Sequence, residues 1–227
     1  MRRLVLKTLR FSASLFNYEI TLNNTKNPNP IRLWNTNSEF NKLLREIGKR
    51  TAMGRQKLFI LYQFAKLAEG NIAEIGVYKG GSSYLMSKAS PQNIVYSFDT
   101  FEGMPETDPV HDIHKKGEFA DFAPDTIDWL KKNLNIKICK GFFPADTGHI
   151  VEDKTFSLVH IDVDIYKSVQ DCLEFFYPRI KSGGIILSDD YGATTTPGAK
   201  TAWDKFFVGK PEKTVYIPTG QCFIIKK

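Results

Sequence analysis

The sequence contains few cysteines and no long apolar run, and both shortages restrict the classes of protein to which it can belong. Its three cysteines, Cys139, Cys172 and Cys222, lie far apart and are odd in number. They form neither a disulfide framework nor the close pairs of a zinc site, which favours a reducing, cytoplasmic location. Because no apolar stretch is long enough to cross a bilayer as a helix, we do not expect a membrane-spanning protein.

Signs of secretion and of nucleic-acid binding are also weak. Four basic residues lie among the first ten, but Lys7 and Arg10 interrupt the apolar run that starts after Arg2 and Arg3. No small-residue cleavage site follows, so we do not expect a signal peptide. We interpret this segment as a solvated arm or helix, with a weak contact to an anionic membrane surface as the alternative. The remaining charge is spread evenly, without the basic stripe of a nucleic-acid-binding protein.

The length of 227 residues suits one α/β domain with a short extension. Internal repeats and low-complexity tracts are absent. An Asn- and Pro-rich stretch, residues 23–37, predicts a loop or an extended arm. We therefore divide the chain into a basic N-terminal arm or helical extension, residues 1–45, and one compact domain, residues 46–227.

The apolar periodicity of the compact domain alternates between helix and strand. Residues 55–70 have helical spacing and end at a glycine. The sequence then predicts strands at residues 71–77, 93–99, 136–141, 156–164 and 183–190, helices at residues 82–90, 124–134, 166–180 and 199–209, and a closing hairpin at residues 213–227. This alternation predicts an α/β fold with a doubly wound, mostly parallel sheet and helices on both faces. In such sheets, ligands bind at the carboxyl ends of the strands.

A glycine-rich turn, with Gly76, Gly80 and Gly81, follows the first predicted strand and lets the backbone approach a ligand closely. Asp99 ends the next strand, where a carboxylate can accept hydrogen bonds from both hydroxyls of a ribose. The pattern here is E-x-G-x-x-x-G-G, which differs from the G-x-G-x-x-G of dinucleotide sites. Glu74 would repel a pyrophosphate but suits the ammonium of a methionine-like group. The turn therefore favours S-adenosylmethionine over NAD.

Aspartates end two further predicted strands. Asp162 and Asp164 follow one strand, and Asp189 and Asp190 follow another. Buried negative charges are costly without a partner, and hard oxygen ligands with no nearby cysteine suit Mg²⁺ or Ca²⁺ rather than Zn²⁺. We therefore predict that Asp162, Asp189 and Asp190 share a divalent cation. We interpret Asp164 as a cap of the helix that follows it.

Several motifs together resemble those of one enzyme family. They are EIGVYKGGSS, SFDTFEGMP, GFFPADT, IDVDIY, LEFFYPRIKSGGIILSDDYG and AKTAWDKFF. Over about residues 50–227 their order resembles the macrocin O-methyltransferases, metal-dependent class I methyltransferases that methylate sugar hydroxyls in natural-product biosynthesis. The resemblance implies a Rossmann-like sheet of seven strands with an antiparallel last strand. It also implies that Mg²⁺ binds to Asp162, Asp189 and Asp190.

The resemblance further implies where S-adenosylmethionine binds. The candidate residues come from the glycine turn, its helix and the end of the next strand: Glu74, Gly76, Tyr78, Gly80, Gly81, Ser82, Ser83, Asp99, Thr100 and Phe101. The long connection at residues 101–124 predicts a lid, in which Phe119 and Phe122 are candidates to cover the adenine. His111 and His114 lie in the same segment without a third ligand, so we do not expect a metal there.

These features predict an enzyme that uses S-adenosylmethionine and Mg²⁺ to methylate a sugar hydroxyl of a natural product, a nucleotide-linked sugar or a surface polysaccharide. Asp162 is the first candidate for the general base, and His149 is the second. The alternatives are a glycosyltransferase that binds metal through its DVD motif, a catechol-type methyltransferase, and a binding protein without chemistry. We expect a homo-oligomer that binds a small-molecule or glycan acceptor and no nucleic acid.

Overall fold

The computed structural model describes residues 32–120 and 123–227 of the chain, which divides into two units, residues 1–37 and residues 38–227. In the first unit, the described residues contain a short helix, α2 (Leu33–Thr36). This helix corrects the prediction of a loop at these positions, because the N–H of Asn37 closes a helical turn by donating to the carbonyl of Leu33 at 2.9 Å. The basic residues of the N-terminal segment lie outside the described residues. The predicted domain boundary at residue 46 stays a prediction.

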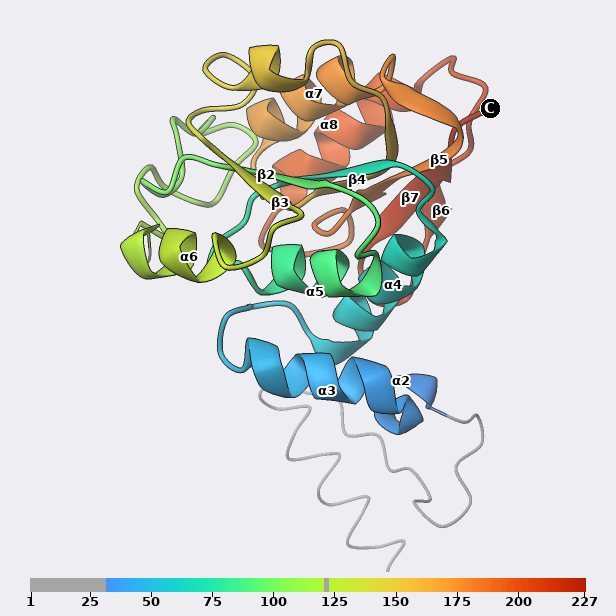
Figure 1. Cartoon of the computed structure of the whole chain (residues 1–227). Coiled ribbons are helices and arrows are strands. Elements are labelled where there is room, and N and C mark those ends of the chain that lie inside the picture. Colours follow the sequence, from blue (N-terminus) through green and yellow to red (C-terminus); the bar gives the residue numbers. More distant parts are fainter. Residues whose placement is uncertain (1–31, 121–122) are drawn as a thin grey trace, which may run out of the picture. The chain divides into compact units, whose positions relative to one another are not determined.

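A seven-stranded sheet forms the centre of the second unit (Figure 1). Its strand order is β3-β2-β1-β4-β5-β7-β6. The strands are β1 (Asn71–Ile75), β2 (Val95–Asp99), β3 (Ile136–Lys140), β4 (Phe156–Ile161), β5 (Ile180–Ser188), β6 (Val215–Tyr216) and β7 (Cys222–Ile225). Strands β1 to β5 are parallel, whereas β7 is antiparallel to both β5 and β6. The predicted fold class and the antiparallel last strand are therefore confirmed.

Helices cover both faces of this sheet (Figure 1). Helices α4 (Arg55–Leu67) and α5 (Gly81–Ala89) lie on one face, and α3 (Ser38–Ile47) packs against α5. Helices α7 (Tyr166–Phe176) and α8 (Pro197–Phe207) lie on the other face. Helix α6 (Ala123–Leu130) contacts the edge strand β3, and the short 3-10 helix η1 (Gly148–Val151) precedes β4. Because both faces are covered, β4 is buried at every position and its sequence is an almost continuous apolar run.

Two helices, α6 and α7, end four residues earlier than the sequence predicts, and neither α2 nor α3 was assigned as a separate helix. Helix α6 ends at Leu130, and Leu134 is exposed instead of extending the buried face of the helix. Helix α7 ends at Phe176. Tyr177 still has a helical backbone, but Pro178 has no N–H with which to continue the helical hydrogen bonds. Ile180, which the helical spacing placed on α7, begins β5. Helix α3 was missed because it directly follows the Asn- and Pro-rich stretch.

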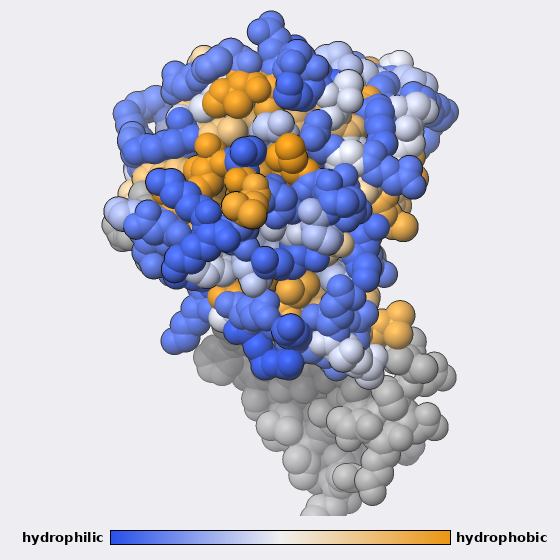
Figure 2. Space-filling view, viewed as in Figure 1, coloured by the Kyte–Doolittle hydropathy of each residue, from blue (hydrophilic) through white to orange (hydrophobic). Residues whose placement is uncertain are grey.

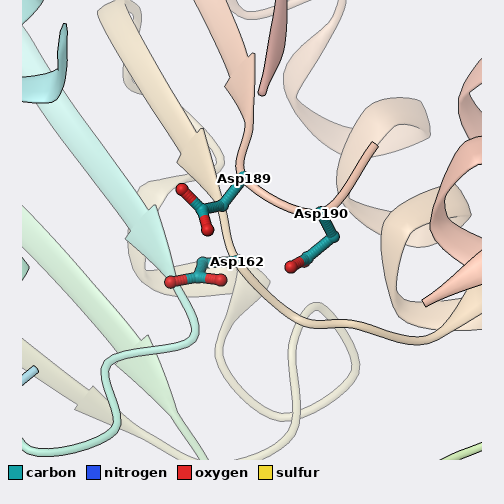
Figure 3. Close-up of side chains that lie close together, drawn as sticks. All are labelled: Asp162, Asp189 and Asp190. Carbon is teal, nitrogen blue, oxygen red and sulfur yellow. The ribbon is translucent and has the colours of Figure 1, made fainter. Parts of the chain in front are cut away.

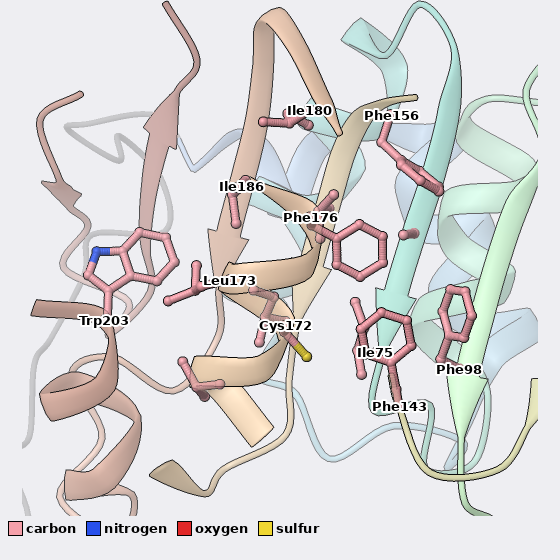
Figure 4. Packing of buried hydrophobic residues seen from close by; sticks show 14 of the residues in the cluster. Ile75, Phe98, Phe143, Phe156, Cys172, Leu173, Phe176, Ile180, Ile186 and Trp203 are labelled. Carbon is pink, nitrogen blue, oxygen red and sulfur yellow. The ribbon is translucent and has the colours of Figure 1, made fainter. Parts of the chain in front are cut away.

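The hydrophobic core lies between the sheet and helices α7 and α8 (Figure 4). Phe98, Phe143, Phe156 and Phe176 form a group of aromatic rings, and Phe176 has centroid distances of 5.0 Å to Phe143 and 5.1 Å to Phe156. Trp203 of α8 is fully buried in the same cluster. The strand residues at the alternate positions point to the other face of the sheet, toward α4 and α5. The core thus holds in place the strands whose carboxyl ends carry the predicted site residues.

The surface of the second unit mixes polar and apolar residues. On the face shown in Figure 2, hydrophobic residues are interrupted by hydrophilic ones. None of the helices within residues 32–120 and 123–227 combines the length and the apolarity needed to cross a membrane. Cys139, Cys172 and Cys222 are buried and free, which confirms that they form no disulfide framework.

Replacement of Phe176 by alanine should lower the free energy of unfolding by about 3–5 kcal/mol, because the fully buried ring packs on Phe143 and Phe156. Leu134→Ala is the control. Its side chain is 95% exposed, so its effect should stay within about 0.5 kcal/mol. Denaturant-induced unfolding measures both variants. Similar stabilities of the two would contradict the described core.

Candidate active site

A cavity of about 360 Å³ lies at the carboxyl ends of the central strands. Its walls come from the glycine turn after β1, the ends of β2, β4 and β5, the loop between α3 and α4, and part of the lid. The predicted site residues that line it are Gly76, Tyr78, Ser82, Asp99, Thr100, Phe101, Phe119, Asp162 and Asp189. The predicted residues that do not line it are Glu74, Gly80, Gly81, Ser83, His149 and Asp190. The cavity therefore joins the predicted cofactor turn to part of the predicted metal site.

The glycine turn needs its glycines for close packing. Gly76 and Gly80 have left-handed backbones, with φ of 89° and 86°. A Cβ atom on Gly76 would overlap the carbonyl oxygen of Asp162, so the turn can lie against the end of β4 only without a side chain there. A Cβ atom on Gly81 would collide with the carbonyl oxygen of Arg50. These close contacts fix the turn at the wall of the cavity.

Asp99 holds the glycine turn from the end of β2. Its Oδ2 accepts hydrogen bonds from the backbone N–H of Val77 at 2.7 Å and of Tyr78 at 3.1 Å. Its Oδ1 accepts from the N–H of Phe101 at 2.7 Å. Burial raises the pKa of Asp99, and these three N–H groups oppose that rise. A carboxylate has about four acceptor positions, and the three N–H groups take three of them. The position that remains suits one ribose hydroxyl, whereas the sequence predicts two.

In the described parts of the chain, every non-glycine residue with a left-handed backbone lines the cavity. These residues are Tyr78, Phe101, Phe119 and Asp164, with φ between 51° and 68°. Such conformations cost on the order of 1–3 kcal/mol each and cluster at functional sites. The rings of Tyr78 and Phe119 meet edge to face with their centroids 5.8 Å apart, so the lid contacts the glycine turn. Phe122, the other aromatic candidate of the lid, lies outside the described residues.

Three carboxylates gather beyond the ends of β4 and β5 (Figure 3). One oxygen from each of Asp162, Asp189 and Asp190 lies within 4.8 Å of the other two. Burial, and after it the neighbouring negative charges, raises the pKa of Asp162 and Asp190 well above the usual range. This donor set consists of hard oxygens and fits a divalent cation such as Mg²⁺. A cation there would also relieve the repulsion between the carboxylates.

Asp189 differs from the other two aspartates because side chains from separate elements hold it. Lys57 of α4 donates to its Oδ2 at 2.6 Å and to its carbonyl oxygen at 2.9 Å, and Gln221 donates to its Oδ1 at 2.9 Å. Burial favours a higher pKa for Asp189, but His160 and Lys57 outweigh burial and lower it. Burial likewise opposes the charge of Lys57, but Asp189 raises the pKa of Lys57. Sequence reasoning missed Lys57 and Gln221, because neither lies near a recognisable motif.

Asp164 does not cap helix α7, contrary to the interpretation from the sequence. The N-cap residue of α7 is Ile165, and Asp112 of the lid accepts the hydrogen bond of the Tyr166 N–H at 2.8 Å. Asp164 instead lines the cavity, and its own N–H donates to Oδ2 of Asp190 at 3.0 Å. Burial raises the pKa of Asp164. Its place beside the carboxylate cluster makes it a further candidate functional residue.

The predicted histidine candidates lie apart from the carboxylate cluster. In the lid, Nδ1 of His111 pairs with Asp108 at 2.7 Å, and Nδ1 of His114 pairs with Glu118 at 2.6 Å. Neither imidazole belongs to the acidic group that could hold a metal in the described chain. His149 is exposed in η1. The geometry therefore offers His149 no contact with the cavity, and its role as a base stays a prediction without structural support.

Comparisons with known sequences place this chain among O-methyltransferases. The model of the macrocin O-methyltransferase (TylF) family matches residues 47–213. An 8-demethyl-8-(2,3-dimethoxy-alpha-L-rhamnosyl)-tetracenomycin-C 4'-O-methyltransferase from Streptomyces olivaceus is 27% identical over 139 residues, which cover 54% of this chain and 53% of the relative. A demethyldecarbamoylnovobiocin O-methyltransferase from Streptomyces niveus is 25% identical over 154 residues, or 60% and 58% of the two chains. The chain thus spans little more than half the length of these relatives.

Solved structures share the fold of the second unit. The structure of the O-methyltransferase NovP has a TM-score of 0.69 and 21% sequence identity, and the match covers 78% of this chain and 82% of NovP. The calicheamicin methyltransferase CalS11 has a TM-score of 0.66 and 17% identity, with 83% and 93% of the two chains covered. At these identities the likeness shows the fold alone, and it agrees with the strand order described above.

Gly76→Ala should lower the free energy of unfolding by about 1–3 kcal/mol more than Gly209→Ala does. Both glycines have positive φ, 89° and 75°, so both variants carry backbone strain. Only at position 76 does the new Cβ atom meet neighbouring backbone, whereas the space around Gly209 is open. Chemical unfolding of the two variants measures the difference. Equal losses would mean that the turn does not lie against the end of β4.

Proposed function

The chain belongs to the macrocin O-methyltransferase family, and from this premise we propose that it transfers the methyl group of S-adenosylmethionine to a sugar hydroxyl with the help of Mg²⁺. One observation carries the proposal: a single cavity joins the turn held by Asp99 to Asp162 and Asp189 of the carboxylate cluster. One relative is named for a rhamnosyl-tetracenomycin substrate, which supports a glycosylated natural product or a related sugar as the acceptor. The cytoplasmic location and the homo-oligomeric state stay predictions.

The residues around the glycine turn would bind and orient S-adenosylmethionine, which supplies the methyl group. Asp99 presents its remaining acceptor position to the ribose, and Gly76 allows close approach of the backbone. Tyr78 and Phe119, in edge-to-face contact, would exclude water from one side of the nucleoside. These roles need the donor held rigidly, because methyl transfer requires donor and acceptor in line.

Asp162, Asp189 and Asp190 would hold the cation. Bound Mg²⁺ supplies a Lewis acid that lowers the pKa of the acceptor hydroxyl. Lys57 keeps its ammonium on Asp189 and contributes one positive charge beside the cluster. Three carboxylates would then be matched by the two charges of the cation and the one of Lys57.

Two carboxylates of this chain can take the proton of the acceptor hydroxyl. Asp162 lines the cavity and also belongs to the predicted ligand set. Asp164 lines the cavity outside that ligand set and has a strained backbone, with φ of 61°. Burial raises the pKa of both side chains, which favours their role as proton acceptors, whereas a bound cation would oppose the rise at its ligand Asp162. Asp162 remains our first candidate, and Asp164 is the alternative that the fold adds.

Asp99→Ala should weaken the binding of S-adenosylhomocysteine by about 1–3 kcal/mol, because a ribose hydroxyl and two backbone N–H groups of the turn lose their acceptor. Calorimetry measures the affinity. Asp153→Ala is the control, since Asp153 is exposed, pairs with the neighbouring Lys154 and lies outside the cavity lining. Undiminished affinity in Asp99→Ala would remove Asp99 from the cofactor site, and equally tight binding of NAD by the native chain would contradict the choice of S-adenosylmethionine.

Removal of divalent cations with EDTA should abolish methyl transfer and leave the binding of S-adenosylhomocysteine largely intact, because the carboxylate cluster and Asp99 occupy different walls of the cavity. Added Mg²⁺ should restore turnover, and Zn²⁺ should substitute poorly for a ligand set of hard oxygens. The assay follows transfer of the labelled methyl group to sugars with adjacent hydroxyls, tested free, nucleotide-linked and polymer-linked, with a catechol as the contrasting acceptor. Full activity after exhaustive metal removal would reject the metal centre.

Asp162→Asn and Asp164→Asn, compared at saturating Mg²⁺, should separate the base from a ligand. Asparagine keeps the size of the side chain but accepts no proton, so the variant of the base should lose about 10²–10⁴-fold in turnover. Turnover of the native enzyme should rise with pH as the base deprotonates. The variant that lacks the base should not show this dependence of turnover on pH. Asp190→Asn is the control. Added Mg²⁺ should partly restore the turnover that this variant loses. Near-native turnover in both Asp162→Asn and Asp164→Asn would place the base elsewhere.

A further inference from the structure

Three polar side chains lie side by side across the middle of the sheet, where apolar residues would be expected. The strand register pairs Glu74 of β1 with Ser97 of β2 on one side and with His160 of β4 on the other. All three residues are fully buried. They lie on the face of the sheet that α4 and α5 cover, because Ser83 of α5 contacts Glu74 and Ser97. A buried polar row is unfavourable unless its members satisfy one another.

Both oxygens of the Glu74 carboxylate have a partner within this row or beside it. One oxygen accepts from the hydroxyl of Ser83, which lies 2.8 Å from the hydroxyl of Ser97. The other oxygen lies 3.0 Å from Nδ1 of His160, which donates to it because a carboxylate only accepts. Neither Glu74 nor Ser83 lines the cavity. Their contacts therefore differ from the S-adenosylmethionine contacts that the sequence predicts for them.

The far end of the row faces a residue of the proposed metal centre. Nε2 of His160 is buried and has no hydrogen-bond partner. It lies 3.9 Å from Oδ1 of Asp189, beyond hydrogen-bond distance. The bond between Nδ1 and Glu74 fixes the plane of the ring and so fixes the direction of Nε2. His160 therefore faces Oδ1 of Asp189, the oxygen that also accepts from Gln221, whereas Lys57 contacts Oδ2.

We propose that Glu74 and His160 are positioning residues for the metal ligand Asp189, and that they do not contact the cofactor. Glu74 orients the ring of His160, and the ring restrains the carboxylate of Asp189 in the place where it meets the cation. The inference rests on the proposed Mg²⁺ site. Residues that hold a metal ligand in place typically change metal affinity by 10–100-fold when they are replaced. The row also links α5, which begins at the glycine turn, to the metal centre.

A pair of crossed substitutions tests this assignment in the full chain. Glu74→Gln keeps the size of the side chain and should raise the dissociation constant for Mn²⁺ about 10–100-fold, while the affinity for S-adenosylhomocysteine stays within about twofold. Asp99→Asn should weaken the binding of S-adenosylhomocysteine and leave the Mn²⁺ affinity unchanged. Asp99 contacts the cofactor turn and is not a member of the carboxylate cluster. Electron paramagnetic resonance measures Mn²⁺, and calorimetry measures the cofactor product. Weaker binding of S-adenosylhomocysteine with unchanged Mn²⁺ affinity in Glu74→Gln would overturn the proposal.

A double substitution tests whether Glu74 acts through the ring. If it does, Glu74→Gln should add nothing to the loss of Mn²⁺ affinity caused by His160→Gln. Additive losses would show two independent effects and would overturn the positioning role. Ser83→Ala, which removes only one hydroxyl from Glu74, should raise the Mn²⁺ dissociation constant about 2–10-fold and provides the test if the other variants fold poorly. A native chain that binds S-adenosylhomocysteine but no Mn²⁺ would instead refute the metal centre itself.

Discussion

The site depends on the repulsion between carboxylates that the fold buries at the ends of β4 and β5. Asp162, Asp189 and Asp190 bring oxygens within 4.8 Å of one another, and Asp164 adds a fourth carboxylate at the cavity wall. Burial and mutual repulsion raise the pKa of Asp162 and Asp190, whereas Asp189, which pairs with Lys57, has a lowered pKa. Without a cation, Asp162 and Asp190 favour protonation, and a divalent cation would allow all three aspartates to ionise together. The geometry of the strand ends therefore underlies the proposed cation site.

The parallel sheet explains why this cluster meets the glycine turn. The ends of β1, β4 and β5 are neighbours in the strand order, so residues that follow them share one edge of the sheet. Gly76 lets the turn lie against the backbone of Asp162. The helices of one layer serve both parts of the site, since α4 supplies Lys57 to Asp189 and α5 begins at the glycine turn. The proposed donor and cation would thereby be held by one frame, as an in-line transfer requires.

Local sequence patterns predicted the elements and the acidic strand ends because burial in a parallel sheet leaves a direct signal, the apolar run that stops at Asp99, at Asp162 or at Asp189. The same patterns failed where a distant segment decides the outcome. Asp164 does not cap α7, because Asp112 of the lid takes that position. Lys57 was missed because its partner lies 132 residues further along the chain. Glu74 points toward α5 and away from the cavity because side chains alternate along β1. The motif alone does not reveal this direction, because it does not show which elements cover each face of the strand.

Crystals grown with S-adenosylhomocysteine and Mn²⁺ offer the most direct measurement of the central claim, because anomalous diffraction locates manganese independently of activity. The account predicts one strong peak coordinated by Asp162, Asp189 and Asp190, with Lys57 still on Asp189. Manganese should bind there because the three aspartates form the acidic group able to hold a metal within residues 32–120 and 123–227. A cluster without manganese, or manganese bound by His111 or His114 of the lid instead, would contradict it.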